Sequence, residues 1–365
     1  MDVEALIRAG LYRPDAPDAS DRLALLEYLT ERGISLEQMV EADRGGRLAF
    51  VVSELVFPEG EHRTVEQVAK DAGLPAERVA RVRMAAGLPA DMEAVVVSSD
   101  FAEILQVFDA AADFFGESAT LAFTRVVGAA VRRVVEAATS LFSAEVAPEL
   151  VTELQFAQAT ELGQGLASTI APVMASLLQE HWYDIAREPA QTLNLPRAGQ
   201  ERQLAVGFVD LTGSTAWAEA LSLRDHAVAL ARFDAAAWDA AASHRVRVVK
   251  MIGDEAMFVA SDADALVRTA LEVCDAVGRD GELPGARGAV GFGSVLSRQG
   301  DYFGPVVNLT SRCVKLAETG SVVVTDAAGA ALTASGWEGT LEALPPRLVP
   351  GLPNPIVVHR ATAGR

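Results

Sequence analysis

The hydrophobic pattern of this chain changes its period near residue 200, and this change constrains the fold more than any other feature. In the first half, apolar side chains recur every three or four residues, as Ile104 and Phe108 do, which is the spacing of one helical face. Prolines and glycines divide this half into separate helices. We therefore expect a helical domain over residues 1–188, a linker over 189–202 and a second domain over 203–365.

The second domain alternates short apolar segments, typical of strands, with longer helical segments. Strands are expected at 204–210, in a hairpin over 246–260, at 286–297 and at 321–326, with helices at 215–243, 263–278 and 305–319. This β-α-ββ-α-β order predicts an α+β fold: an all-helical N-terminal domain followed by a ferredoxin-like (βαββαβ) antiparallel sheet with helices on one face.

The composition is that of a globular chain, because half of its residues are hydrophobic. No apolar run approaches the roughly 18 residues that a membrane span requires. The first residues include Asp2 and Glu4 and lack the basic region of a signal peptide. Cys274 and Cys313 lie in helix-like segments without metal-binding spacing, which favours buried thiols in a reducing compartment. We therefore expect a cytoplasmic protein without a membrane span.

The net charge of −19 is concentrated in the first half of the chain. Residues 1–195 carry 31 acidic and 15 basic side chains, whereas residues 196–365 carry 19 and 16. An acidic half repels the phosphates of nucleic acids and anionic lipids. No nucleic-acid partner is therefore expected. The nearly neutral half, by contrast, can hold a polyanionic nucleotide when metal ions intervene.

Two carboxylates in the second domain stand where phosphate chemistry would need them. Asp210 ends an apolar strand, and Asp254 lies at the tip of the hairpin. Carboxylates at adjoining strand ends can hold two divalent ions about 3.5–4 Å apart for in-line attack at phosphorus. The turn Thr212-Gly213-Ser214 can offer backbone N–H groups to phosphates. A helix cap at Asp210 and a simple turn at Asp254 are the structural alternatives.

Three segments in this domain carry a specific resemblance. FVDLTGST (208–215), VKMIGDEAMF (249–258) and GDYFGPVVNLTSR (300–312) resemble, in this order and spacing, the signature blocks of class III adenylyl cyclases. The similarity covers roughly residues 203–360. It implies conversion of ATP to 3′,5′-cyclic AMP and pyrophosphate.

The resemblance also implies a role for individual residues at the metal site. Asp210 and Asp254 match the family's two metal-binding aspartates, and the backbone carbonyl of Leu211 matches a further metal contact. The expected cofactors are therefore two divalent ions, Mg²⁺ or Mn²⁺. One would activate the ribose 3′-hydroxyl, and the other would help the pyrophosphate leave.

A second set of residues matches the positions that bind the nucleoside. Lys250 and Asp301 match the pair that reads the adenine edge, which guanylyl cyclases usually replace with Glu and Cys. Asn308 matches the residue that positions the ribose, and Arg312 the residue that stabilises charge on phosphorus. Asn308 and Arg312 are four residues apart on an expected helix and so share one face. In this family the two sets come from opposite subunits, which implies a head-to-tail homodimer with two sites.

The first half offers a rival reading through its segment 64–87. This segment resembles a helix-turn-helix with Gly73 at the turn and with Arg78, Arg81 and Arg83 in the second helix. A DNA-binding regulator is therefore a competing hypothesis. Neighbouring acidic residues nearly cancel these arginines, which favours a helical bundle that uses the same packing motif.

The overall plan resembles actinobacterial adenylyl cyclases whose helical N-terminal domain is autoinhibitory and pH-responsive. His181 lies in the segment that leads to the second domain, and histidine changes its charge between pH 5 and 8. An exposed histidine without a role is the alternative. Six phenylalanines could also enclose an apolar ligand such as a fatty acid, although a packed core is favoured; they are Phe108, Phe114, Phe115, Phe123, Phe142 and Phe156.

Overall fold

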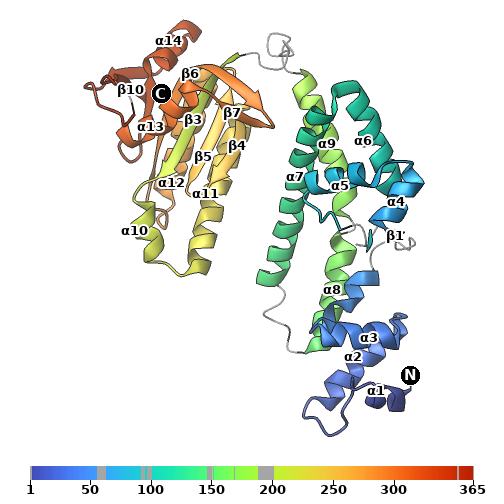
Figure 1. Ribbon diagram of the computed structural model, residues 1–365. Helices are drawn as coiled ribbons and strands as arrows, with labels where there is room; N and C mark the ends of the chain where they lie inside the picture. Colours follow the sequence, from blue (N-terminus) through green and yellow to red (C-terminus); the bar gives the residue numbers. More distant parts are fainter. Residues whose placement is uncertain are drawn as a thin grey trace. The chain divides into compact units, whose positions relative to one another are not determined.

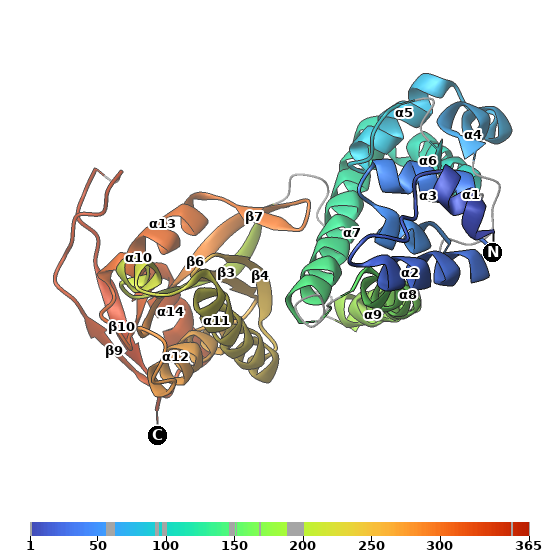
Figure 2. The same ribbon diagram turned by 90° about the horizontal axis from the view of Figure 1, so that it is seen from below.

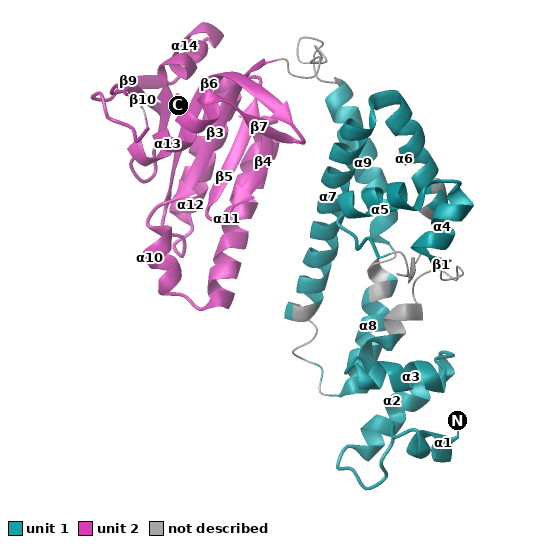
Figure 3. Cartoon of the chain, in the orientation of Figure 1, with its two compact units in different colours: residues 1–187 teal, residues 188–365 magenta. Residues whose placement is uncertain are grey.

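The computed structural model divides into two compact units, residues 1–187 and 188–365 (Figure 3). Each unit has its own core, and each is described by itself. Most of the expected linker, residues 189–200, lies outside the described part of the chain. The described residues are 2–55, 63–91, 95–96, 101–145, 150, 152–167, 169–187, 201–351 and 353–364. Within them, no helix has both the length and the apolar character needed to cross a membrane.

The first part of unit 1 is a small helical core. Its elements are α1 (Val3–Arg8), α2 (Ala19–Glu31), α3 (Leu36–Arg44), the 3₁₀ segment η1 (Leu48–Leu55) and α8 (Glu153–Ala167). Leu25, Leu26 and Leu29 of α2 are fully buried among these elements. Arg22 adds polar links, because it forms ion pairs with Asp43 of α3 and Glu153 of α8.

The rest of unit 1 contains the helix-turn-helix segment. Its elements are β1 (Arg63–Thr64), α4 (Val65–Ala72), α5 (Ala76–Ala85), β2 (Val95–Val96), α6 (Phe101–Phe115), α7 (Glu117–Glu145) and α9 (Ile170–Arg187) (Figure 1). A small core here includes residues of α4, α5 and α6. A capping box at Thr64 starts α4, and Gly73 ends it in the left-handed conformation that glycine tolerates. The strands β1 and β2 form an antiparallel ribbon that the all-helical prediction did not include.

Unit 2 contains one mixed sheet. Its strands are β3 (Arg202–Leu211), β4 (Arg247–Ile252), β5 (Glu255–Ala260), β6 (Ala286–Arg298), β7 (Asp301–Phe303), β8 (Val322–Thr325), β9 (Thr340–Ala343) and β10 (Val358–Thr362). They follow the order β4-β5-β3-β6-β8-β10-β9, with β7 paired to β6. The first four strands have the ferredoxin-like order and antiparallel neighbours, which confirms the predicted fold class. The pairing of β6 with β8 is parallel, however, so the sheet as a whole is mixed.

Helices cover both faces of this sheet, so the expectation of helices on one face was wrong. The helices are α10 (Ser214–Glu219), α11 (Leu223–His244), α12 (Ala263–Arg279), α13 (Pro305–Cys313), the 3₁₀ turn η3 (Val314–Leu316) and α14 (Asp326–Ser335). One core lies between the sheet and α11, α12 and α14, and the other lies between the sheet, α13 and η3. Figure 2 shows α13 on the opposite side of the sheet from α11 and α12. The reason is the alternation of side chains along β3 and β6, which makes both faces apolar.

Candidate functional site

The two aspartates meet where β3 and the β4–β5 hairpin end. Asp210 pairs in register with Glu255 of β5, and the N–H of Leu211 donates to the carbonyl of Asp254 over 3.0 Å. The hairpin turns at Gly253 and Asp254, as the sequence predicted. Three acidic residues therefore lie together at the adjoining ends of two interior strands, β3 and β5: Asp210, Asp254 and Glu255.

These carboxylates repel one another in a partly buried place. Burial raises the pKa of Asp210, the charge of Asp254 raises it further, and the hydrogen bond and charge of Arg287 oppose this rise. Burial, with the charges of Asp210 and Asp254, raises the pKa of Glu255 to about 7. Lys315 of η3 opposes both rises. A cation bound at such a site would favour the ionised carboxylates and lower their pKa values.

Arg287 is a functional candidate that the sequence patterns did not reveal. It lies on β6 directly opposite Asp210 in the strand register, and its Nη2 lies 3.4 Å from Asp210 Oδ2. Its Nε is buried and has no hydrogen-bond partner in the described part of the chain. The guanidinium thus holds a loose ion pair with the aspartate and keeps a donor for another group.

The turn after β3 is fixed by the loop before β6. The N–H of Thr212 donates to the carbonyl of Gly285 over 2.9 Å, and its hydroxyl donates to the carbonyl of Pro284 over 3.0 Å. Gly213 adopts a φ of +67°, which a residue with a side chain rarely adopts, and Ser214 begins α10. The turn is therefore anchored, and its shape depends on a glycine.

The structure brings Lys250 and Asp301 together, the two residues that the resemblance assigns to the adenine edge; their contact with adenine stays a prediction. Lys250 lies on β4 and Asp301 begins β7, and Lys250 Nζ lies 2.5 Å from Asp301 Oδ2. The N–H of Tyr302 donates to the other carboxylate oxygen of Asp301 over 2.8 Å. Arg247 Nη1 donates to the buried Tyr302 hydroxyl over 2.9 Å and so ties the same two strands together.

Asn308 and Arg312 lie exposed on α13, on the side away from the sheet. Their four-residue spacing puts both side chains on one face, as expected. The Arg312 guanidinium lies against the backbone of Gly351, where an added Cβ would stand 2.7 Å from Nη1. No hydrogen bond or ion pair within the described residues joins the aspartate cluster to Lys250, Asp301, Asn308 or Arg312.

Comparison with known proteins identifies the first unit. The adenylate cyclase regulatory domain is the family whose profile matches residues 2–185. An uncharacterized protein of Mycobacterium tuberculosis is 31% identical over 329 residues, which cover 88% of this chain and 85% of that protein. The chain belongs to the adenylate cyclase regulatory-domain family.

Two further relatives of this cyclase-family chain have named activities. A pH-sensitive adenylate cyclase of M. tuberculosis is 28% identical over 370 residues, covering 94% of this chain and 89% of that protein. An adenylate cyclase of Glutamicibacter nicotianae is 40% identical over 123 residues, covering 34% of this chain and 30% of that protein. Among solved structures, the catalytic core of a rhodopsin-guanylyl cyclase matches with a TM-score of 0.41 at 22% identity, over 45% of this chain and 97% of that one. The family assignment does not depend on that structural likeness.

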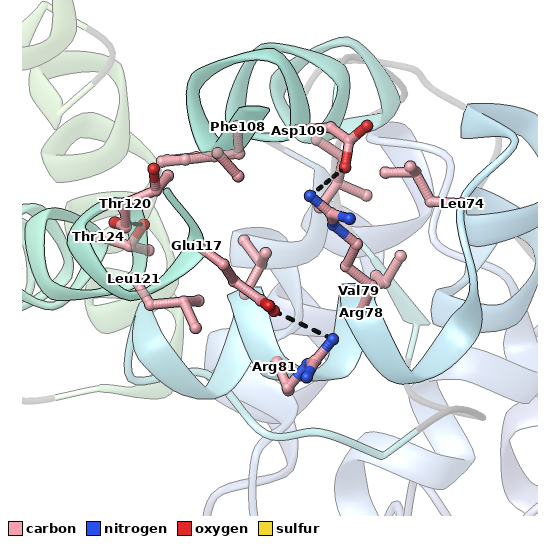
Figure 4. Close-up of a pocket in the computed structure, with 13 residues that line it drawn as sticks. Leu74, Arg78, Val79, Arg81, Phe108, Asp109, Glu117, Thr120, Leu121 and Thr124 are labelled. Carbon is pink, nitrogen blue, oxygen red and sulfur yellow. Dashed lines mark hydrogen bonds and ion pairs between the residues drawn. The ribbon is translucent and has the colours of Figure 1, made fainter. Parts of the chain in front are cut away.

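Within the regulatory domain, the helix-turn-helix is packed against its neighbours. Arg78 forms an ion pair of 2.6 Å with Asp109 of α6, and Arg81 one of 3.0 Å with Glu117 of α7 (Figure 4). Arg83 is buried. Arginines used in this way hold α5 on the helical bundle, which favours the packing interpretation of segment 64–87 over DNA binding.

The remaining expectations for the regulatory domain concern His181 and the phenylalanines. His181 lies exposed on α9. Phe114, Phe115 and Phe123 are more than half exposed, so these rings do not enclose a ligand. The cavity beside Phe108 in Figure 4 has a volume of about 20 Å³. That volume suits about one water molecule and is too small for a fatty acid. Phe156 lines a separate, more open hollow of about 350 Å³, so the apolar ligand stays a prediction.

Proposed function

We propose that the chain is an adenylate cyclase, which converts ATP to 3′,5′-cyclic AMP and pyrophosphate. The observation that carries the proposal is that Asp210 and Asp254 lie together at adjoining strand ends, in a chain that also pairs Lys250 with Asp301. Family membership of the regulatory domain and the named activities of two relatives support it.

The oxygen donors at these strand ends fit divalent cations. Burial and the charge of Asp254 both raise the pKa of Asp210, and a bound cation would favour the ionised form of both carboxylates. Within the described residues, no group of three or more His, Cys, Asp or Glu side chains is arranged to hold a metal. Two carboxylates, the Leu211 carbonyl and substrate phosphates together suit Mg²⁺ or Mn²⁺, which are commonly held by few protein ligands plus phosphates. When bound, two such ions would favour the ionised 3′-hydroxyl and offset charge on the leaving pyrophosphate.

The protein's own groups then have distinct tasks. The 3′-oxygen forms a bond to the α-phosphorus, and the 3′-hydroxyl proton passes to solvent. The bond between the α-phosphorus and the oxygen that bridges it to the β-phosphate breaks, and pyrophosphate leaves. Arg287 would leave its loose pair with Asp210 and donate to the phosphates, beside the backbone of Thr212, Gly213 and Ser214. Positioning and electrostatic stabilisation supply most of the rate in this scheme.

The nucleoside side of the site has four residues. Lys250 would donate to adenine N1, and Asp301 would accept from the N6 amine, so the 2.5 Å pair opens to admit the purine edge. Asn308 would hold the ribose, and Arg312 would stabilise charge on the phosphorus. We infer that these four residues bind the same ATP as the two aspartates of a second subunit, in a head-to-tail homodimer with two equivalent sites.

Nucleotide turnover by the purified full-length chain tests this function. With Mg²⁺ or Mn²⁺ and ATP, cyclic AMP should form, and Asp210→Ala or Asp254→Ala should abolish its formation. Asp275→Ala is the matched control, because Asp275 is an exposed aspartate of α12 whose ion pair is with Arg279, one turn further along the same helix. Cyclic GMP from GTP without cyclic AMP from ATP would overturn the substrate assignment.

We also propose that the regulatory domain restrains the cyclase and that acidic pH weakens the restraint. The description of the matched domain and the pH-sensitive relative support this. His181 on α9 is the candidate for the charge change. Removal of residues 1–195 should raise activity at neutral pH and flatten its pH profile, provided that the product is still dimeric. A truncated dimer that keeps the full-length pH profile would refute the proposal.

A further inference from the structure

Helix α13 carries Asn308 and Arg312 on one side and rests on the sheet with the other. The side chains that face the sheet are Val306, Thr310 and Cys313. They contact β6 and the adjoining core residues. The position of Asn308 and Arg312 is therefore set by how closely this buried side of α13 approaches β6.

Two glycines of β6 lie beneath α13. Side chains alternate along a strand, and Ala289 and Val295 belong to the core on the α13 side. Gly291 and Gly293 share their parity and so face α13 as well. Neither glycine has a positive φ, so each could be replaced by alanine without backbone strain. Any effect of the replacement must come from contact with the helix.

The two positions differ sharply in the space that they leave. A Cβ at Gly291 would overlap the hydroxyl oxygen of Thr310 and would lie 3.1 Å from Val306 Cγ2. A Cβ at Gly293 would lie 3.4 Å or more from its nearest neighbour, Val306, which is ordinary contact. The helix is thus seated against the bare backbone at Gly291 but not at Gly293.

Thr310 cannot easily move its oxygen away from Gly291. The side chain is fully buried, and its hydroxyl donates to the carbonyl of Val306 over 2.7 Å within the same helix. Rotation would break this hydrogen bond and leave a buried hydroxyl without a partner, at a cost of about 1–3 kcal/mol. Relief of the overlap would therefore displace α13 from the sheet instead.

We propose that the close contact between Gly291 and Thr310, here called the seat, sets the distance of α13 from β6. In this way it positions Asn308 and Arg312. The inference rests on the proposed function for its effect on activity. A displacement of about 1 Å of a catalytic group can lower a rate about 100-fold. Gly291 and Thr310 are positioning residues, since they act through α13 and not on the nucleotide.

The kinetic test enlarges the residue on one side of this contact, at Gly291, and then shortens the residue on the other side, at Thr310. Gly291→Ala should lower kcat about 10- to 100-fold. The KM for ATP should change less than kcat does, because Arg312 acts on charge that develops in the transition state, whereas Asn308 also holds the ribose of bound ATP. Adding Thr310→Ala removes the overlapping oxygen and leaves Thr310 Cβ 3.4 Å away, so the double variant should recover to within about threefold of Thr310→Ala alone. Adding Thr310→Val keeps a γ atom at the same place and should not rescue.

The matched control is Gly293→Ala, on the same strand face, which should keep activity within about twofold of the wild type. Equal losses in Gly291→Ala and Gly293→Ala, or no rescue by Thr310→Ala in a folded dimer, would overturn the seat. Crystal structures of Gly291→Ala and the double variant give a readout independent of activity: α13 should move about 1 Å from β6 in the first and return in the second. If the wild type makes no cyclic AMP, the proposed function fails, and these two structures still decide whether the seat exists.

Discussion

Glu255 makes the stability of unit 2, the proposed catalytic unit, depend on pH in a direction that the structure specifies. Burial and the charges of Asp210 and Asp254 raise its pKa from 4.5 to about 7. The unfolded chain keeps the ordinary value, so between these two pH values the folded protein holds a proton that the unfolded chain does not. Stability contributed by this group therefore falls as the pH rises from about 4.5 to 7, and the loss is complete above 7.

Glu255→Gln should remove that loss. One pKa unit corresponds to 1.36 kcal/mol, so the shift sets an upper limit of about 3 kcal/mol. Partial solvent contact reduces the expected gain to about 1–2 kcal/mol at pH 8 in the metal-free protein. At pH 4, where Glu255 is protonated in both states, the variant should gain nothing.

Urea unfolding in EDTA at several pH values measures this difference. Tryptophan fluorescence follows the catalytic unit, because Trp217, Trp238 and Trp337 lie in it, and Trp182→Phe removes the one in the regulatory domain. Glu219→Gln is the control, since Glu219 is an exposed carboxylate of the same unit. A gain from Glu255→Gln that is the same at pH 4 and pH 8, or a loss at pH 8, would refute the electrostatic reasoning.

Three further substitutions test other contacts of the structure. Lys250→Ala should raise the KM for ATP about 10- to 100-fold, because a charged hydrogen bond to the purine contributes about 1.5–3 kcal/mol; an unchanged KM would contradict the assigned role. Tyr302→Phe should lower the free energy of unfolding by about 1 kcal/mol, because it removes the hydrogen bond from Arg247 to the Tyr302 hydroxyl, and urea unfolding checks this. Arg78→Ala should destabilise the regulatory domain by about 1 kcal/mol through its pair with Asp109; calorimetry should find the catalytic unit unaffected.

Strongly patterned segments of the fold were predictable from the sequence. The strand that ends at Asp210, the hairpin that turns at Asp254 and the helix α12 all have the expected place. Each combines a regular apolar period with a clear turn signal, so local physics determines it. Segment 64–87 also forms the expected helices. A capping box at Thr64 and Gly73 fix the two ends of the first of them, α4.

What escaped prediction depends on contacts between distant segments. The register of β3 against β6 places Arg287 opposite Asp210 across 77 residues of sequence, and no local pattern encodes that pairing. The raised pKa of Glu255 depends on burial, which arises only when the sheet assembles. The strand β7 has three residues, too few for a periodic signal, and the close approach of Thr310 to Gly291 joins two elements through the core.

The central claim is that two subunits share each catalytic site, and mixing two inactive variants tests it most directly. Asp210→Ala would lose one of the two proposed metal-binding aspartates, and Arg312→Ala would lose the arginine that the other subunit's ATP would need. In a mixed dimer, one of the two sites keeps every functional group. The account predicts that cyclic AMP formation returns when the two variants exchange subunits, up to about half of the wild-type activity per mixed dimer. No recovery, with subunit exchange demonstrated by differently tagged chains, would contradict the shared site.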